Sequence, residues 1–193
     1  MTRWVYLLLS LFALPAMAVD PAMTSYSVIE DTGIDTQGLV GVNVGAGDLN
    51  QQINGRAIAT GQEHVARLQL QQELALPSLD LTQEAHAHLL GGSFSNSSGL
   101  IGVNQAAGTG NQQINAFRLS HGRQLRQDLD DSVLAQQLVA PAQPSGATEQ
   151  PRGGRVVVTD DKAFAGSRGV VQLNQSAGVG NQTVNSLSMT VVE

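Results

Sequence analysis

The sequence predicts a mostly β protein in which three strand-turn-strand repeats stack as a short β-solenoid or cross-β-like layer structure, joined by partly helical or disordered linkers. One phrase occurs three times, at Gly38–Asn54, Gly99–Asn115 and Gly169–Asn185. Each copy holds two alternating runs separated by a Gly-rich step, as expected for two strands and a turn. Asn and Gln recur at equivalent positions, and Asp48 is the only charged residue within the three copies. Uncharged amides at repeated positions favour strands stacked in layers.

The chain begins with a predicted secretory signal peptide at residues 1–18. A short apolar run follows Arg3, and the ending Ala16-Met17-Ala18 predicts cleavage before Val19. The run is too short to cross a bilayer, and the chain has no Cys that could carry a lipid anchor or form a disulfide. We therefore expect export through the periplasm and release to the outside of the cell, with no stable membrane insertion.

Charge and aromatic content exclude other classes of protein. The 193 residues include 10 Lys plus Arg and 16 Asp plus Glu, a net charge of −6, and loss of Arg3 with the signal peptide makes it −7. This charge, without any basic patch, argues against binding of nucleic acid. After cleavage the only aromatic residues are Tyr26, Phe94, Phe117 and Phe164, fewer than a conventional globular core would use.

The repeats divide the chain into alternating segments. Equivalent glycines of successive copies lie 61 and 70 residues apart, longer and less even than the period of a continuous solenoid. We therefore expect the intervening segments to loop out between stacked units. The predicted organisation after the signal peptide is an N-terminal segment 19–37, repeat one 38–60, linker one 61–92, repeat two 93–120, linker two 121–155 and repeat three 156–193.

Within each repeat we expect a strand, a tight turn and a second strand. In the second copy, Leu100–Gln105 alternates as a strand, Ala106–Gly110 is rich in small residues, and Asn111–Leu119 alternates again. Glycine adopts the positive φ angles that such reversals need. The sequence leaves open whether the two strands form a hairpin or a β-arch. The predicted turn glycines are Gly45, Gly47, Gly108, Gly110, Gly178 and Gly180.

The recurring amides are the candidate functional residues. Amide side chains at the same position in stacked layers can donate to one layer and accept from the other, forming ladders parallel to the backbone hydrogen bonds. Carboxylates at these positions would stack like charges and repel one another. The predicted self-assembly residues are Asn43, Asn50, Gln51, Asn54, Asn104, Asn111, Gln112, Asn115, Asn174, Asn181, Gln182 and Asn185.

The linkers have a different composition from the repeats. Apolar residues near helical spacing precede Pro77 in linker one, and a series at i, i+4 and i+8 from Leu125 predicts a short amphipathic helix within His121–Leu138. The Pro/Gly/Ser-rich stretch Pro141–Gly154 is expected to be disordered. Val156–Thr159 is expected to form a short strand that leads into the third repeat.

Several motifs that could carry metal or cofactor chemistry are incomplete. His86 and His88 form an H-x-H pair that could bind a metal with His64 or His121, but solvated linker histidines are expected instead. The acidic cluster that begins at Asp128 lacks the Gly and terminal Glu of a calcium loop. The G-x-G steps of the repeats lack the Lys-Ser/Thr pair of a phosphate loop, and no G-x-S-x-G elbow occurs. We expect no enzyme, no cofactor and no metal.

The phrases VNQAAGTGNQQIN and VNVGAGDLNQQIN resemble the repeat signature of the Fap functional amyloid proteins of pseudomonads. The layout of a signal peptide, three imperfect repeats and two variable linkers is also similar to that family. Curli subunits are a more distant likeness, since only Gln105, Gly108 and Asn111 match their spacing. The resemblance implies passage through an outer-membrane export pore and assembly with itself or other fibre subunits into cell-surface fibres that support biofilm.

This chain departs from the principal fibre subunits of that family. The resemblance implies longer repeats and a C-terminal Cys motif in such subunits, whereas this chain has short repeats and no Cys. We therefore favour a minor subunit, a nucleator or an assembly accessory. The alternative is a secreted soluble binding module, either an adhesin or a periplasmic chaperone for fibre subunits.

Overall fold

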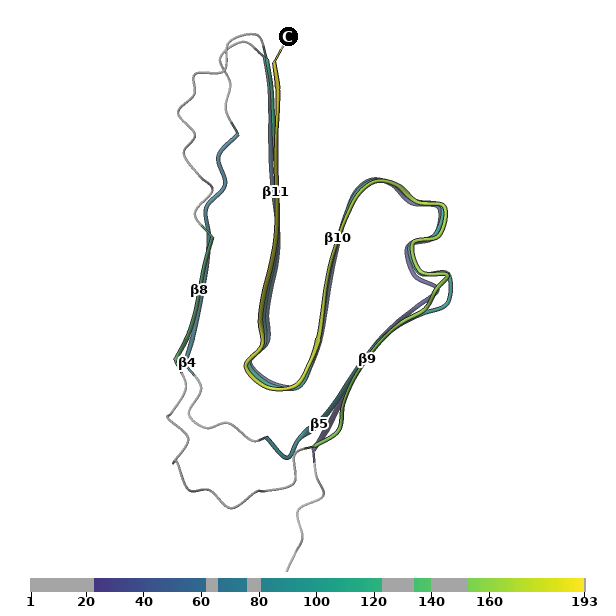
Figure 1. The fold of residues 1–193 in the computed structure, drawn as a ribbon, viewed down its shortest axis with the longest axis vertical. Helices are drawn as coiled ribbons and strands as arrows, with labels where there is room; N and C mark the ends of the chain where they lie inside the picture. Colours follow the sequence, from purple (N-terminus) through teal and green to yellow (C-terminus); the bar gives the residue numbers. More distant parts are fainter. Residues whose placement is uncertain (1–22, 62–65, 76–80, 123–133, 140–152, 193) are drawn as a thin grey trace, which may run out of the picture.

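The computed structural model of the chain describes residues 23–61, 66–75, 81–122, 134–139 and 153–192. In these residues the backbone forms eleven strands and no helix. Figure 1 looks down the stack, so that strands from distant parts of the sequence lie over one another. The strands are β1 (Thr24–Glu30), β2 (Gln37–Ala46), β3 (Gln51–Thr60), β4 (Leu70–Ala75), β5 (Glu84–Leu90), β6 (Ser98–Ala107), β7 (Gln112–Gly122), β8 (Leu134–Val139), β9 (Arg155–Thr159), β10 (Arg168–Ala177) and β11 (Gln182–Val192).

These strands form four parallel sheets, ordered β1-β5-β9, β2-β6-β10, β3-β7-β11 and β4-β8. Each sheet takes its strands in chain order from successive parts of the sequence. The chain is therefore arranged in three layers, which we call layer 1 (β1 to β4), layer 2 (β5 to β8) and layer 3 (β9 to β11). The expectation of a mostly β structure with stacked strands is confirmed.

The register of the sheets places equivalent positions of the three phrases beside one another. Asn43 pairs with Asn104, and Asn104 pairs with Asn174. The glycines that begin the phrases are aligned in the same way, as are the strands after the turn, from the pairing of Gln51 with Gln112 onward. A slip by one residue would turn every amide to the opposite face, so this register determines the site.

The two strands of each phrase form a β-arch, the geometry that the sequence left open. β2 and β3 belong to different sheets, as do β6 and β7 and also β10 and β11. Each strand therefore makes its backbone ladder with other layers, while the two strands of one phrase face each other through their side chains. In layered β structures, side chains of two facing sheets interdigitate and form a zipper between the sheets.

The predicted helices and looped-out linkers are wrong for the described residues. Linker one supplies β4 and β5, and linker two supplies β8, so these segments add strands to the layers. The pattern of Leu70, Gln72 and Leu74 fits a period of two, and Gln72 and Leu74 are buried in β4. Tertiary packing thus outweighs a weak helical pattern. Residues 123–133 and most of Pro141–Gly154 lie outside the described residues, whereas the strand expected at Val156–Thr159 is confirmed as part of β9.

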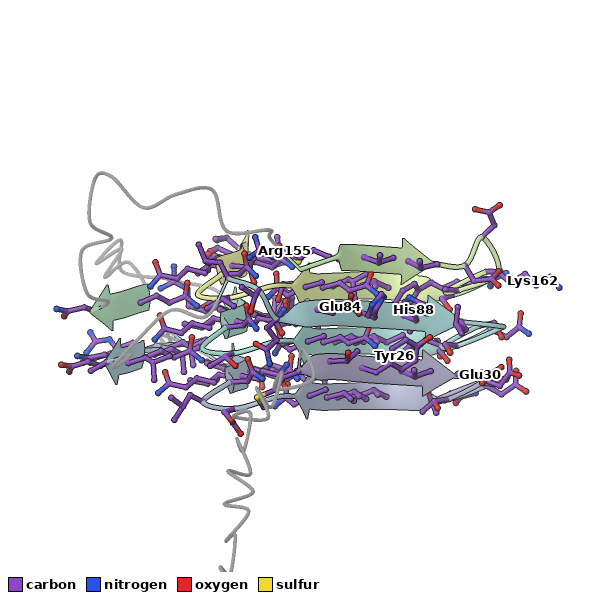
Figure 2. All side chains as sticks on the ribbon, turned by 90° about the horizontal axis from the view of Figure 1, so that it is seen from below. Tyr26, Glu30, Glu84, His88, Arg155 and Lys162 are labelled. Atoms are coloured by element: carbon purple, nitrogen blue, oxygen red, sulfur yellow. The ribbon has the colours of Figure 1, made fainter. Side chains whose placement is uncertain are left out.

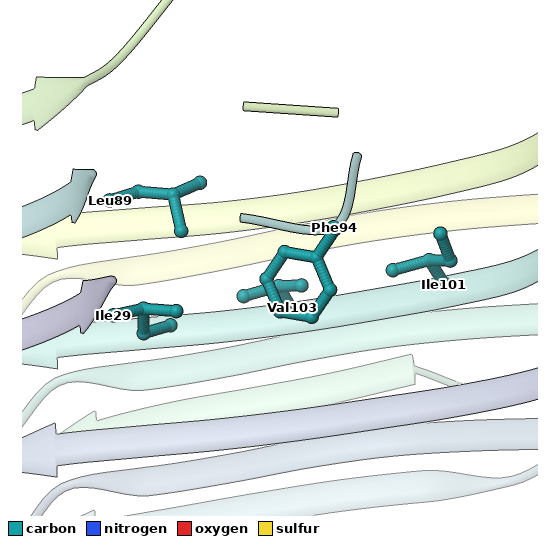
Figure 3. Packing of buried hydrophobic residues seen from close by; sticks show 5 residues of the cluster. All are labelled: Ile29, Leu89, Phe94, Ile101 and Val103. Carbon is teal, nitrogen blue, oxygen red and sulfur yellow. The ribbon is translucent and has the colours of Figure 1, made fainter. Parts of the chain in front are cut away.

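The apolar core lies between the sheet β1-β5-β9 and the sheet β2-β6-β10. Its centre is a cluster of five buried residues that Figure 3 shows at close range: Ile29, Leu89, Phe94, Ile101 and Val103. The ring of Phe94 also stacks on Phe164 of layer 3, with 5.4 Å between the ring centroids. Layer 2 is the most buried, because it alone has a layer on each side. Its strands β6 and β7 are almost wholly buried, whereas β2 and β10 are partly exposed.

The chain turns a corner between the sheet β1-β5-β9 and the sheet β2-β6-β10, and the residue at this corner is aromatic in layers 2 and 3 but glycine in layer 1. Phe94 and Phe164 have φ angles of 59° and 60°, and Gly33 occupies the corresponding place in layer 1 with φ of 70°. A Cβ atom on Gly33 would lie 2.6 Å from the ring of Phe94. Layer 1 therefore leaves room for the ring of layer 2, and burial of the ring offsets a left-handed backbone that costs about 1–2 kcal/mol.

Candidate functional site

The amides of the first strand form a column that runs through all three layers. The Nδ2 group of Asn104 donates to Oδ1 of Asn43 at 2.9 Å, and Nδ2 of Asn174 donates to Oδ1 of Asn104 at 3.0 Å. Asn115, across the arch, also donates to Oδ1 of Asn104 at 3.0 Å. The facing columns of one arch are thereby joined into a network, and Asn104 has no exposed surface.

The column at the turn both joins layers and closes the arch. Nδ2 of Asn111 donates to Oδ1 of Asn50 at 2.9 Å, and Nδ2 of Asn181 donates to Oδ1 of Asn111 at 2.7 Å. Nδ2 of Asn111 also lies 3.3 Å from the carbonyl oxygen of Ala107 in its own turn and 3.1 Å from that of Gly178 in layer 3. An acidic side chain could not supply these donors.

The other two predicted columns follow the same rule, so the structure brings all twelve predicted amides into interlayer columns. In every bond that joins these amides across two layers, the donor belongs to the higher layer. The bonds are Gln112 to Gln51 at 3.0 Å, Gln182 to Gln112 at 2.7 Å, Asn115 to Asn54 at 3.0 Å and Asn185 to Asn115 at 3.2 Å.

The shared direction of donation in these four columns makes their two ends different. Among the described residues, the side-chain oxygens of the layer 3 amides Asn174, Asn181, Gln182 and Asn185 accept no hydrogen bond. At the other end, Nδ2 of Asn43 makes one bond, to the carbonyl oxygen of Gln52 at 3.3 Å, whereas the equivalent group of Asn104 makes three. Layer 3 therefore presents four unused side-chain acceptors, and layer 1 presents one little-used donor, at Asn43.

The network also contains glutamines that were not among the predicted residues. Gln105 is fully buried and donates to backbone oxygens of Ser27 and His88, while Gln175 donates to Oε1 of Gln105 at 2.9 Å. Nε2 of Gln52 donates to Oε1 of Gln113 at 2.9 Å, and Nε2 of Gln113 donates to Oγ of Ser176 at 3.0 Å, so this column runs opposite to the four predicted columns. The signal for Gln52 and Gln113 was present, since both follow a selected glutamine within the repeated phrase. They were not predicted because the third copy has Thr183 at this position, and only positions with an amide in all three copies were selected.

The turn glycines divide into two kinds. Gly47, Gly108 and Gly178 have φ angles of 92°, 99° and 131°, and Gly110 and Gly180 have φ angles of 71° and 70°. Gly45 is not a turn residue, because it lies inside β2 and pairs with Ala106. The turn position equivalent to Gly110 is occupied in layer 1 by Leu49, with φ of 57°. The prediction of Gly45 as a turn residue is therefore wrong. The two glycines of the first copy, Gly45 and Gly47, lie two residues earlier in the repeat than Gly108 and Gly110 of the second copy.

The amide columns contain no charged residue, but the first arch contains two, Asp48 and Arg56. Asp48 is exposed at the tip of the first turn. Arg56 of β3 extends its side chain towards β2, where its Nη2 group donates to the carbonyl oxygen of Val40, and burial lowers the pKa of its guanidinium. Gly41 and Gly102 make room for that side chain, since Cβ atoms there would lie 3.0 Å and 3.3 Å from Nη2. Phe117 and Leu187 take its place in the other layers.

The histidine pair lies on a strand and not in a solvated linker, which corrects that expectation. His86 and His88 point to one face of β5, beside Tyr26 of β1, as Figure 2 shows for Tyr26 and His88. The hydroxyl of Tyr26 lies 2.8 Å from Nδ1 of His88. His64 and the acidic cluster at Asp128 lie outside the described residues. Within the described ranges there is no group of three His, Asp or Glu residues that could hold a metal, and no helix that could span a membrane.

The sequence of the chain matches a known protein family. A family model described as "Functional amyloid protein FapB/FapC family" matches residues 15–192. The curated protein "Functional amyloid subunit FapC" of Pseudomonas aeruginosa strain PAO1 is 38% identical over 97 residues, which cover 46% of this chain and 28% of the relative. The chain thus matches less than a third of that relative's length. No solved structure matches the chain.

Proposed function

Because the chain belongs to the FapB/FapC family of functional amyloid proteins, we propose that it is a secreted minor subunit, nucleator or assembly accessory of an extracellular amyloid fibre. The observation that carries the proposal is the set of amide columns that end in unused acceptors on layer 3 and, at Asn43, in a little-used donor on layer 1. A copy placed on either end would continue both the backbone ladders and the columns, which is how cross-β assemblies grow.

In this proposal the described strands form a short β-solenoid of three layers that acts as a segment of the fibre. The strands at both ends of each three-stranded sheet have unpaired edges, and natural monomers normally protect such edges. The twelve predicted amides are the self-assembly residues, and the partners are further copies of this chain or other fibre subunits.

The proposal of a minor role rests on the differences from the curated relative. The chain matches only 28% of that protein, and it has no Cys. The third phrase also departs from the other two, since Gln172 and Leu173 replace the glycine and valine that both other copies have. A chain that starts or modifies a fibre needs to match the main subunit at one end only, so these departures fit a nucleator.

A seeding experiment tests the proposed function. The purified chain of residues 19–193 should bind an amyloid dye, form fibres and shorten the lag time of fibre formation by a main subunit of the same family. A boiled or protease-digested sample of the chain is the control. A stable, soluble monomer that neither forms fibres nor seeds them would reject the proposal and favour the binding-module alternative.

Export is tested separately from assembly. We propose passage through the periplasm and an outer-membrane export pore to the cell surface, with the signal peptide removed after Ala18. N-terminal sequencing of material recovered from the cell exterior should begin at Val19. Recovery of a product that retains Trp4 would contradict this route.

A further inference from the structure

We propose that layer 3 carries an acceptor site for one additional strand, and that strand β4 of a second copy of this chain fills it. The inference rests on the proposed function, because it requires that copies of the chain meet at their ends. The first three sheets contain three strands each, whereas the fourth contains only β4 and β8. Figure 1 shows this pair running beside β11, on the outer side of the sheet β3-β7-β11. The described residues place no third strand there.

The outward residues of β11 in layer 3 are more exposed than the equivalent residues of β7 in layer 2. In layer 2 the outward residues Gln112, Ile114 and Ala116 of β7 are all buried, with exposed fractions of 0%, 0% and 2%. In layer 3 the residue that pairs with Ile114 is Val184, which is 44% exposed, and Gln182 is exposed as well. Layer 1 is also an end layer, yet its equivalent residue Ile53 is only partly exposed, so the exposure of Val184 reflects the absence of a strand beside β11 as well as the open end.

The outward glutamines of the three layers also differ in their hydrogen bonds. In layer 1, Nε2 of Gln51 donates to the carbonyl oxygen of Glu73 on β4 at 2.9 Å. In layer 2, Nε2 of Gln112 donates to the carbonyl oxygen of Gln137 on β8 at 3.3 Å. In layer 3, Gln182 has no such partner among the described residues. An added strand would supply the missing carbonyl group.

The sequence of the occupant follows from the two strands already in this column. β4 and β8 share the pattern Leu-x-Gln-x-Leu and pair in parallel, with Gln72 beside Gln136. Nε2 of Gln136 donates to Oε1 of Gln72 at 2.8 Å, and among the described residues Oε1 of Gln136 accepts no bond. A third strand with a glutamine at this position would continue the column. β4 of a second copy has that glutamine, and its Glu73 would lie beside the uncharged Gln137.

The exchange of β4 between copies conserves the number of strand pairs, and it moves the open place from layer 3 of one copy to layer 1 of the copy above, where Gln51 loses its bond to Glu73. β4 would leave β8 of its own chain and pair with the free edge of β8 in the chain below it, as in a domain swap. The required shift is one layer, about 4.8 Å. Residues 61–69 connect β3 to β4, and a chain of that length can span about 30 Å. The exchanged strand would tie neighbouring copies together across their contact.

Cysteine trapping tests the register of this contact. The chain has no native Cys, so a Glu73→Cys chain mixed with a Gln137→Cys chain can form a mixed disulfide only between copies. Paired residues on neighbouring strands lie about 4.8 Å apart, within disulfide range. Glu73 and Gln137 are both exposed, so the substitutions should not disturb folding.

A matched control uses Gln71→Cys in place of Glu73→Cys. This position is also exposed but lies two residues out of register, about 8 Å from residue 137 and beyond disulfide range. We expect at least about fivefold more mixed dimer from the 73–137 pair than from the 71–137 pair. Equal yields would overturn the inference. Without exchange, the neighbour's β4 would lie two layers above β8, about 9.5 Å away, and neither pair would cross-link.

A second comparison tests the acceptor face itself. Val184→Asp should reduce the 73–137 cross-link about tenfold, because it places a charge where the added strand packs. Val171→Asp is the control, since Val171 is a layer 3 residue with a similar exposed fraction, 41%, on β10. Equal losses in the two variants would contradict the proposed face. Fibres formed without the register-specific cross-link would reject this inference alone, whereas cross-linked dimers without fibres would reject the proposed function alone.

Discussion

Asn111 shows how the structure depends on amide chemistry at the scale of one residue. Its Nδ2 group faces three oxygen atoms, on Asn50, Ala107 and Gly178, and its Oδ1 atom accepts a bond from Asn181. The side chain is fully buried. Each such bond contributes about 1 kcal/mol net, but a buried oxygen left without its donor costs about 1–3 kcal/mol. Replacement of one amide therefore affects three layers together.

The first prediction is that Asn111→Asp destabilises the chain strongly and in a pH-dependent way. The carboxylate would face three oxygens, so we expect a loss of about 3–5 kcal/mol at neutral pH. Burial would raise the pKa of the new carboxyl in the folded chain above its unfolded value of about 3.9. The loss should therefore be smallest below pH 4 and should grow as the pH rises towards the folded pKa. Chemical denaturation at several pH values measures this.

The matched control for that variant is Val179→Asp. Val179 occupies the turn position at which layer 1 already carries Asp48, so an acid there should change the free energy of unfolding by less than about 1 kcal/mol. Fibre formation should likewise be blocked by Asn111→Asp and retained by Val179→Asp. If the two variants behave alike, the amide columns are not the element that determines assembly.

The second prediction concerns the leucine that adopts a glycine conformation. Leu49 has φ of 57° and is 51% exposed, so its backbone strain is not offset by burial. Leu49→Gly should raise the free energy of unfolding by about 1 kcal/mol, because a left-handed L-residue costs about 1–2 kcal/mol. The reciprocal variant Gly110→Ala, at φ of 71°, should lower it by a similar amount. Thermal unfolding of the two variants checks both signs, and a destabilising Leu49→Gly would refute the argument.

At the scale of the strand and turn, the spacing between layers is set by positions that have no side chain. A Cβ atom on Gly108 would lie 2.0 Å from the carbonyl oxygen of Gly178, and one on Gly47 would lie 2.4 Å from that of Gly108. These turns stack at the distance of the backbone ladder only because nothing projects between them. At the other end of the strands, Gly99 and Gly169 approach the glycine of the layer below in the same way.

The third prediction compares two glycines of one column. Gly108→Ala places a methyl group against backbone, whereas at Gly178 the nearest atoms belong to the side chain of Arg155, 3.1 Å away. Both variants carry backbone strain, but only Gly108→Ala adds a clash inside the chain. We expect Gly108→Ala to destabilise the monomer by at least about 2 kcal/mol more than Gly178→Ala. Equal unfolding free energies would show that the layers can separate at little cost.

Much of this element-scale picture could be predicted from the sequence, and the failures have physical causes. The three phrases gave the strands, the register and the twelve stacked amides, because an unusual pattern repeated three times allows few alternatives. The strands of the linkers were not predictable in the same way, since Leu70, Gln72 and Leu74 fit a strand only when β3 is beside them. Gly45 was misplaced because glycine marks both turns and close packing.

For the whole molecule, the important contrast is between a covered middle layer and two open ends. Layer 1 contains five of the acids among the described residues, Glu30, Asp31, Asp35, Asp48 and Glu73, whereas layer 2 contains Glu84 and layer 3 contains Asp160 and Asp161. The full chain has a net charge of −6. Copies that approach one another therefore meet a repulsive field before their ladders can join.

The fourth prediction follows from that field. Assembly of the chain should be faster at high ionic strength, where the Debye length falls from about 10 Å at 0.1 M to about 3 Å at 1 M. It should also be faster as the pH falls towards the sequence pI of about 5.1, where the net charge vanishes. Dye-binding kinetics across salt and pH measure both trends. A rate that is independent of salt would show that charge does not limit the approach of copies.

The covered middle layer also has a kinetic meaning. If each chain formed one layer, the first layer with neighbours on both sides would appear only when three molecules met, and its rate would depend steeply on concentration. Here β6 and β7 have both neighbours within one polypeptide, so that encounter becomes intramolecular and its effective concentration is fixed by the connecting segments. We expect the lag before growth to depend only weakly on protein concentration, so dilution would slow elongation far more than it delays the start.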